Sequence, residues 1–349
     1  MGWVTPLGAG LEEVWARLGA GDTAEVKTLA NPETGRALAY APVPMTLVEA
    51  LGRNPRLRRS SAISYFAVAA GLAALENAGI TMTPELAART AVVFAISSGG
   101  VAYTRRFYEQ LVKQGANAAS PLLFPETVYN APASHLSAQL GIDGASYTLV
   151  GDASVGLAAL KFAEQLLATS DLAQVVVVGS EETDWVLCAA YREWRLARGA
   201  AGRGALLAEG AAAVVLARAG RVEIAALHAG VPVFRRADAA AAVERVFADL
   251  LAGRKADAVI GSANGTFVDR AEGAAIARHC PEAAAYFPKS AFGEALGAGA
   301  LMQVIVGALA VVKGAVPGGE ARGDALKTAL VSTLGFNQQA SGLVLARAE

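Results

Sequence analysis

Short apolar runs alternate with longer alanine-rich segments along the whole chain. In one run, four valines from Val175 to Val178 follow one another, which is typical of a strand in a sheet covered on both faces. The pattern predicts strands at residues 91–95, 147–150, 174–179, 211–217, 222–226, 258–261, 329–334 and 343–346. It predicts helices at residues 61–78, 133–140, 154–168, 239–252, 271–279 and 296–312. Strands that alternate with helices of this length indicate an α/β fold with much parallel pairing.

The alternation runs through the chain twice. Each of the two repeats of this alternation ends in apolar strands, the first near Arg218 and the second at the C-terminus. Residues 202–210 are rich in Gly and Ala and are expected to form a loop before the last strand of the first run. We therefore predict two similar halves, residues 1–218 and 219–349, packed tightly together.

Composition favours a large core and a protein partner. Hydrophobic residues make up 54% of the 349 residues and charged residues only 17%, so further apolar area is expected in a subunit interface. A net charge of −1 argues against nucleic-acid binding, which needs a dense cationic face. The glycines and Gln303 within residues 296–312 favour a packed core helix over a membrane span. With two cysteines and no visible signal peptide, we expect a reduced, cytoplasmic protein.

Five stretches, in order along the chain, resemble the β-ketoacyl synthases. They are residues 2–8, 129–133 with 140–144, 157–163 with 178–181, 264–266 with Glu272, and 289–299 with Gly335-Phe336. The resemblance implies a thiolase-like fold, a five-layered αβαβα sandwich of two pseudo-symmetric halves that usually dimerises through its central sheet. It also implies that much of the family's opening strand, ahead of Gly2, is missing.

The resemblance further implies a catalytic set that this sequence has lost. In the family, a cysteine at the start of a buried helix carries the acyl chain, because the positive end of the helix lowers the pKa of its thiol. Two histidines help to expel carbon dioxide from a malonyl unit. The matching positions here are Ala153, Asn264 and Glu294, and only Lys289 keeps the family's identity.

The leading hypothesis is therefore a chain-length-factor-like subunit. The resemblance implies that it pairs with an intact ketosynthase in a heterodimer, serves an acyl carrier protein, and acts in polyketide, aryl polyene or fatty-acid-type biosynthesis. Phe336 matches the family's gate position, although residues 337–339 replace the usual small residues. Ala153 also departs from the glutamine that polyketide chain length factors often carry.

Two other functions stay open. Ser154, with Asp152 before Ala153, could act as a nucleophile helped by Glu294 and Lys289, in a homodimeric acyltransferase or hydrolase. The simpler interpretation is that Ser154 caps the helix and Asp152 favours its N-terminus through the helix dipole. The chain could also be an acyl-binding pseudoenzyme.

The remaining polar residues are given structural interpretations. Lys289 is expected to form an ion pair with Asp269 or Glu272. Histidine and cysteine spacing supports no metal site, and no glycine pattern matches a phosphate or dinucleotide loop, so we expect no cofactor. Two groups of basic residues are expected to be either ordinary solvated surface or a docking patch for an acidic carrier protein. They are Arg53, Arg56, Arg58 and Arg59, and the pair Arg105 and Arg106.

Overall fold

The computed structural model describes residues 1–199, 202–320 and 326–348, and its core is formed by two five-stranded sheets. The first sheet has the order β1 (Gly2–Val4), β8 (Gly210–Ala217), β6 (Gln174–Glu181), β4 (Thr90–Ile96) and β5 (Ser146–Val150). The second has the order β11 (Ala284–Tyr286), β10 (Ala258–Ile260), β12 (Thr328–Leu334), β13 (Gln339–Arg347) and β9 (Val222–Pro232). All eight predicted strands are present, but β9 runs to Pro232 rather than residue 226, and β13 begins at Gln339 rather than residue 343.

The two sheets repeat one topology. If the five strands of each sheet are numbered by their order in the chain, they lie side by side in the order third, second, fourth, fifth, first. In each sheet only the fifth strand, β8 or β13, runs antiparallel to its neighbours. The first sheet draws its strands from residues 2–217 and the second from residues 222–347.

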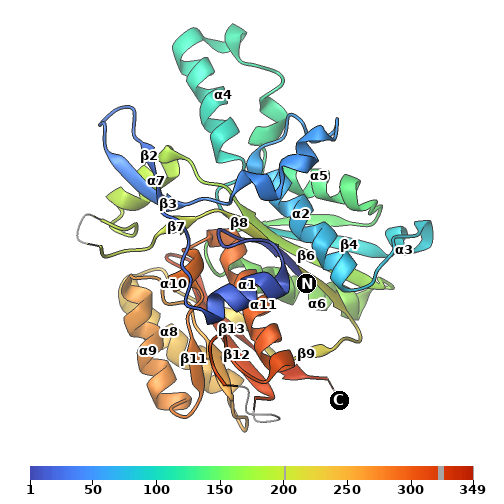
Figure 1. Ribbon diagram of the computed structural model, residues 1–349, viewed down its shortest axis with the longest axis vertical. Coiled ribbons are helices and arrows are strands. Elements are labelled where there is room, and N and C mark those ends of the chain that lie inside the picture. Colours follow the sequence, from blue (N-terminus) through green and yellow to red (C-terminus); the bar gives the residue numbers. More distant parts are fainter. Residues whose placement is uncertain (200–201, 321–325, 349) are drawn as a thin grey trace.

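Helices cover both faces of each sheet, which gives five layers (Figure 1). On the outer face of the first sheet lie α2 (Ala62–Asn77) and α5 (Ala131–Leu140). Between the sheets lie α6 (Val155–Thr169) and α11 (Leu296–Lys313). On the outer face of the second sheet lie α8 (Ala239–Leu250) and, beside it, α9 (Phe267–His279). This is the α/β sandwich that the family resemblance implies.

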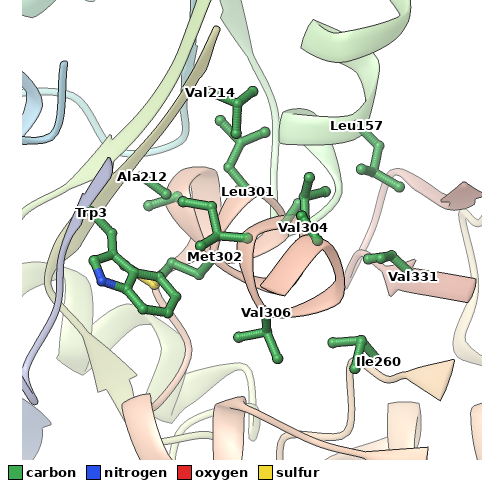
Figure 2. Close-up of a cluster of buried hydrophobic side chains, with 14 of the residues drawn as sticks. Trp3, Leu157, Ala212, Val214, Ile260, Leu301, Met302, Val304, Val306 and Val331 are labelled. Atoms are coloured by element: carbon green, nitrogen blue, oxygen red, sulfur yellow. The ribbon is translucent and has the colours of Figure 1, made fainter. Parts of the chain in front are cut away.

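Helix α11 is the centre of the hydrophobic core. It is long and apolar enough to cross a membrane by length and composition, but 89% of it is buried inside the fold. Figure 2 shows Leu301, Met302, Val304 and Val306 of α11 surrounded by apolar side chains from both sheets and from α6. A helix that is apolar on all sides is stable in water only when other elements enclose it.

One glycine allows α11 to approach the first sheet closely. A Cβ atom added at Gly179 of β6 would lie 2.5 Å from the carbonyl oxygen of Gly297. Since real Cβ atoms do not approach a backbone oxygen so closely, any side chain at residue 179 would push α11 away from β6.

Several elements have no counterpart among the predicted ones. A small third sheet has the order β2 (Lys27–Ala30), β3 (Ala37–Ala41) and β7 (Leu207–Ala208). The expectation of a loop at residues 202–210 is therefore wrong in part, because β7 pairs with β3. Additional helices are α3 (Pro84–Ala88), α4 (Val101–Gln114), α7 (Trp185–Glu193) and α10 (Lys289–Phe292), whereas α1 (Leu11–Gly19) is the helix with Trp15 that the family resemblance implies after residues 2–8.

Candidate functional site

Ala153 lies at the tip of a buried helix, as the sequence predicts. Strand β5 ends at Val150, and α6 begins at Val155 after the N-cap residue Ser154. The methyl group of Ala153 is completely buried. A methyl group can neither attack a thioester nor carry an acyl chain.

Asp152 organises the turn before α6. Its Oδ1 accepts hydrogen bonds from the hydroxyl of Ser154 at 3.2 Å and from the Ser154 backbone N–H at 3.3 Å. Its Oδ2 accepts from the backbone N–H of Asn337 at 3.0 Å, and Gln338 Oε1 accepts from the backbone N–H of Asp152 at 3.0 Å. The prediction that the Ser154 side chain caps α6 is wrong, because its hydroxyl is turned back to Asp152. The carboxylate of Asp152 does lie at the N-terminus of α6, where the helix dipole favours a negative charge.

Phe336 lies in a buried aromatic cluster. Its ring centroid is 5.8 Å from that of Tyr191 and 6.4 Å from that of Phe267. Only 8% of Phe336 is exposed. The Phe336 side chain is therefore held on two sides by other rings.

Lys289 and Glu294 form a buried ion pair. Lys289 Nζ lies 2.8 Å from Glu294 Oε2, and the two side chains are 2% and 0% exposed. Lys289 also donates to the hydroxyl of Ser262 at 2.9 Å, and Asn264 Nδ2 donates to Glu294 Oε2 at 2.7 Å. The structure thus brings together three of the sequence-predicted residues, Lys289, Glu294 and Asn264. No hydrogen bond joins Ser154 to this cluster in the described part of the chain.

The predicted ion-pair partners of Lys289 are wrong. Asp269 accepts hydrogen bonds from the backbone N–H groups of residues 264 and 265, and Glu272 accepts from those of residues 262 and 263. Glu294 takes their place because Gly293, at φ +87°, turns the chain back after the short helix α10. Glu294 Oε1 is also buried and has no hydrogen-bond partner among the described residues.

Buried carboxyl groups that the sequence analysis missed lie at the end of β6. Burial raises the pKa of Glu181 to about 8, although the backbone N–H groups of Ser97 and Ser98 donate to it. Glu182 accepts from the hydroxyl of Ser61 at 2.5 Å and from the backbone N–H of Ala102 at 2.9 Å, and burial raises its pKa. The available signal was a pair of adjacent glutamates, Glu181 and Glu182, which follow the run of four valines and Gly179-Ser180.

Tyr191, also missed, links these parts of the site. Burial raises the pKa of its phenol, and the charges of Glu181, Asp152 and Glu294 act in the same direction. Tyr191 is therefore within electrostatic reach of the β6 carboxyl, the turn before α6 and the Lys289 cluster.

Histidines and cysteines supply no catalytic pair in the described residues. His135 Nε2 lies 3.2 Å from Ser60 Oγ and 2.7 Å from Glu126 Oε1. Because one nitrogen makes both contacts, the imidazole cannot relay a proton from the serine to the carboxylate. The other two histidines pair with Asp249 and Glu244. In residues 1–199, 202–320 and 326–348, no three His, Cys, Asp or Glu side chains form a metal-binding group.

Both cysteines are buried and free. Burial raises the pKa of Cys188 to about 12 and that of Cys280 to about 11. Because the thiolate is the reactive form of cysteine, both thiols are expected to be inert at neutral pH.

Comparisons with known proteins agree with this fold. At 21% identity, a β-ketoacyl synthase from Burkholderia phymatum STM815 superposes with a TM-score of 0.81 over 100% of this chain and 98% of its own. The ishigamide ketosynthase/chain length factor, also 21% identical, superposes with a TM-score of 0.79 over 100% of this chain and 98% of its own. These likenesses show the fold.

Sequence comparison gives the family. The 3-oxoacyl-[acyl-carrier-protein] synthase 2 of Vibrio cholerae serotype O1 is 26% identical over 183 residues, which are 52% of this chain and 44% of that enzyme. The chain thus matches less than half the length of this curated relative. The family description "Beta-ketoacyl synthase, N-terminal domain" matches residues 1–221, more than half of the chain. The chain therefore belongs to the β-ketoacyl synthase family.

Proposed function

We propose that this chain is the non-condensing, chain-length-factor-like subunit of a ketosynthase heterodimer that acts on acyl chains held by an acyl carrier protein. The observation that carries the proposal is the buried methyl group of Ala153 at the tip of α6. Loss of a nucleophile alone lowers kcat about a million-fold in a well-studied protease. A chain with alanine at this position needs a partner for condensation.

The two histidine positions support the same conclusion. Asn264 donates to Glu294, and Glu294 in turn accepts from Lys289, so both side chains are engaged inside the protein. Decarboxylation of a malonyl unit places negative charge on an enolate, and a carboxylate at that place would oppose it. The cluster fits a structural role better than a catalytic one.

The alternative with Ser154 as nucleophile has less support. Its hydroxyl is fully buried and donates to Asp152. None of the three histidines makes a hydrogen bond to it in the described part of the chain. With no histidine to act as base, a serine hydroxyl is a poor nucleophile.

The partner would lie along β5 and α4. In the described part of the chain, strand β5 pairs only with β4, and Tyr147 and Val150 on β5 are exposed. Helix α4 has no buried residue and projects away from the sandwich (Figure 1). Exposed large apolar side chains in and after this helix are Tyr108, Val112, Leu122, Phe124, Val128 and Tyr129. An open strand edge and an apolar patch of this kind are typical of protein interfaces.

Co-expression tests the proposal. The chain is produced with an intact ketosynthase encoded beside its gene, and the mass of the product is measured by size exclusion with light scattering. We expect a 1:1 complex that extends an acyl group with malonyl-carrier protein, and loss of extension when the partner's cysteine is replaced. Val112→Asp on α4 should weaken the complex, whereas Val312→Asp, at an exposed valine of α11, should not.

Two results would contradict the proposal. One is a homodimer of this chain that condenses acyl groups without a partner. The other is covalent acylation of Ser154 detected by mass spectrometry of tryptic peptides.

A further inference from the structure

A cavity of about 380 Å³ lies beside the loop that carries Asn264. Among the described residues, its lining contains no acidic side chain and four arginines, Arg192, Arg195, Arg203 and Arg236. Four positive charges around one cavity repel one another, although water screens the three that are exposed, Arg195, Arg203 and Arg236. The repulsion is relieved when an anion occupies the cavity.

Two of the guanidinium groups are held in place by neutral partners. Arg192 donates to the carbonyl oxygen of Arg198 at 2.6 Å, and Arg236 donates to that of Trp194 at 2.7 Å. Arg236 also lies over the ring of Phe267, at 5.6 Å from its centroid. These contacts fix the side chains without neutralising their charge.

Arg195 is placed by an uncommon backbone conformation. Its φ of +58° lies in the left-handed region, which residues with a Cβ rarely adopt. Its backbone N–H donates to the carbonyl oxygen of Arg192 at 3.1 Å, so the turn sets both arginines beside the same cavity.

None of the four arginines forms an ion pair with a carboxylate in residues 1–199, 202–320 and 326–348. The neighbour Arg235 behaves differently, because it forms an ion pair with Asp238 at 2.9 Å. The four charges of the cavity are thus left available to a ligand, whereas that of Arg235 is not.

We propose that this cavity binds a small phosphorylated molecule through its phosphate group. The planar fork of arginine matches phosphate oxygens, and each such contact is a charge-assisted hydrogen bond. The volume lies in the range of small-ligand sites. The inference rests on the cavity alone and does not depend on the heterodimer proposed above.

Isothermal titration of the full chain with sodium pyrophosphate, at constant ionic strength, tests the inference. We expect saturable 1:1 binding that weakens roughly tenfold or more in Arg236→Gln, since a charged hydrogen bond is removed. Arg195→Gly should weaken binding similarly, and glycine suits the left-handed backbone at that residue. The matched control Arg235→Gln should bind as the unmodified chain does.

Melting curves confirm that each variant is folded before its titration is compared. The inference is overturned if pyrophosphate gives no saturable heat up to the millimolar range. It is equally overturned if Arg235→Gln weakens binding as much as Arg236→Gln, because the effect would then be a general change of surface charge.

Discussion

Replacing Lys289 by methionine should destabilise the fold by about 3–5 kcal/mol, the usual cost of removing one partner of a buried ion pair. The structure supports this large loss of stability because the side chains of Lys289 and Glu294 are only 2% and 0% exposed and their charged atoms are 2.8 Å apart. After the substitution, Glu294 keeps a single side-chain donor, Asn264 Nδ2 at 2.7 Å. Its other oxygen already has no partner among the described residues.

A double substitution separates the lost ion pair from lost packing. Lys289→Met with Glu294→Gln removes both charges and keeps an oxygen that accepts from Asn264. We expect the double variant to be more stable than Lys289→Met alone by about 2 kcal/mol or more, because no buried charge is left without a partner.

Equilibrium urea unfolding, followed by tryptophan fluorescence and far-ultraviolet circular dichroism, gives the free energies. Lys161→Met is the control, because the Lys161–Glu164 pair is equally short, at 2.6 Å, but its side chains are 33% and 45% exposed. Lys161→Met should lower the free energy of unfolding by about 1 kcal/mol or less. A loss below about 1 kcal/mol for Lys289→Met would refute the view that this pair stabilises the site.

Three further predictions concern chemistry, pH and assembly. Ala153→Cys should not restore condensation in an assay for carbon dioxide release, because the two histidine positions still hold an amide and a carboxylate. Burial raises the pKa of Glu181 to about 8 and those of Glu209 and Glu272 to about 7. The folded state therefore binds more protons than the unfolded state between pH 4.5 and 8, so urea midpoints should fall as pH rises through that window, and less so in Glu181→Gln. Val150→Asp should weaken the heterodimer at least tenfold in analytical ultracentrifugation, since it places a charge on the open strand edge; unchanged affinity would exclude β5 from the interface.

Most of the sandwich could be predicted from the sequence because its core strands and helices are strongly apolar. Strand β6, predicted at residues 174–179, runs to Glu181, and α9, predicted from residue 271, begins at Phe267, where Thr266 caps it. Helix α4 and strand β2 were not predicted, because they lie on the surface and neither contains a buried residue.

The site was predictable as a set of positions but not as a set of contacts. The family resemblance pointed to Ala153, Asn264, Glu294 and Lys289, and the structure brings the last three into hydrogen-bond contact. The choice of Glu294 as partner of Lys289 depends on a left-handed turn at Gly293, which spacing alone does not reveal. Tyr191 was missed because α7 lies far from these residues in the chain.

The two central helices cross between the halves of the chain. Helix α6, from the first half, packs against β9 and β13, while α11, from the second half, packs against β6 and β8. During synthesis, the first sheet is therefore made before α11, the helix that packs against it, and α11 has the hydropathy of a membrane span until both sheets enclose it. We expect residues 1–218 expressed alone to aggregate, so the repeat seen in the topology marks duplicated architecture rather than two units that fold independently.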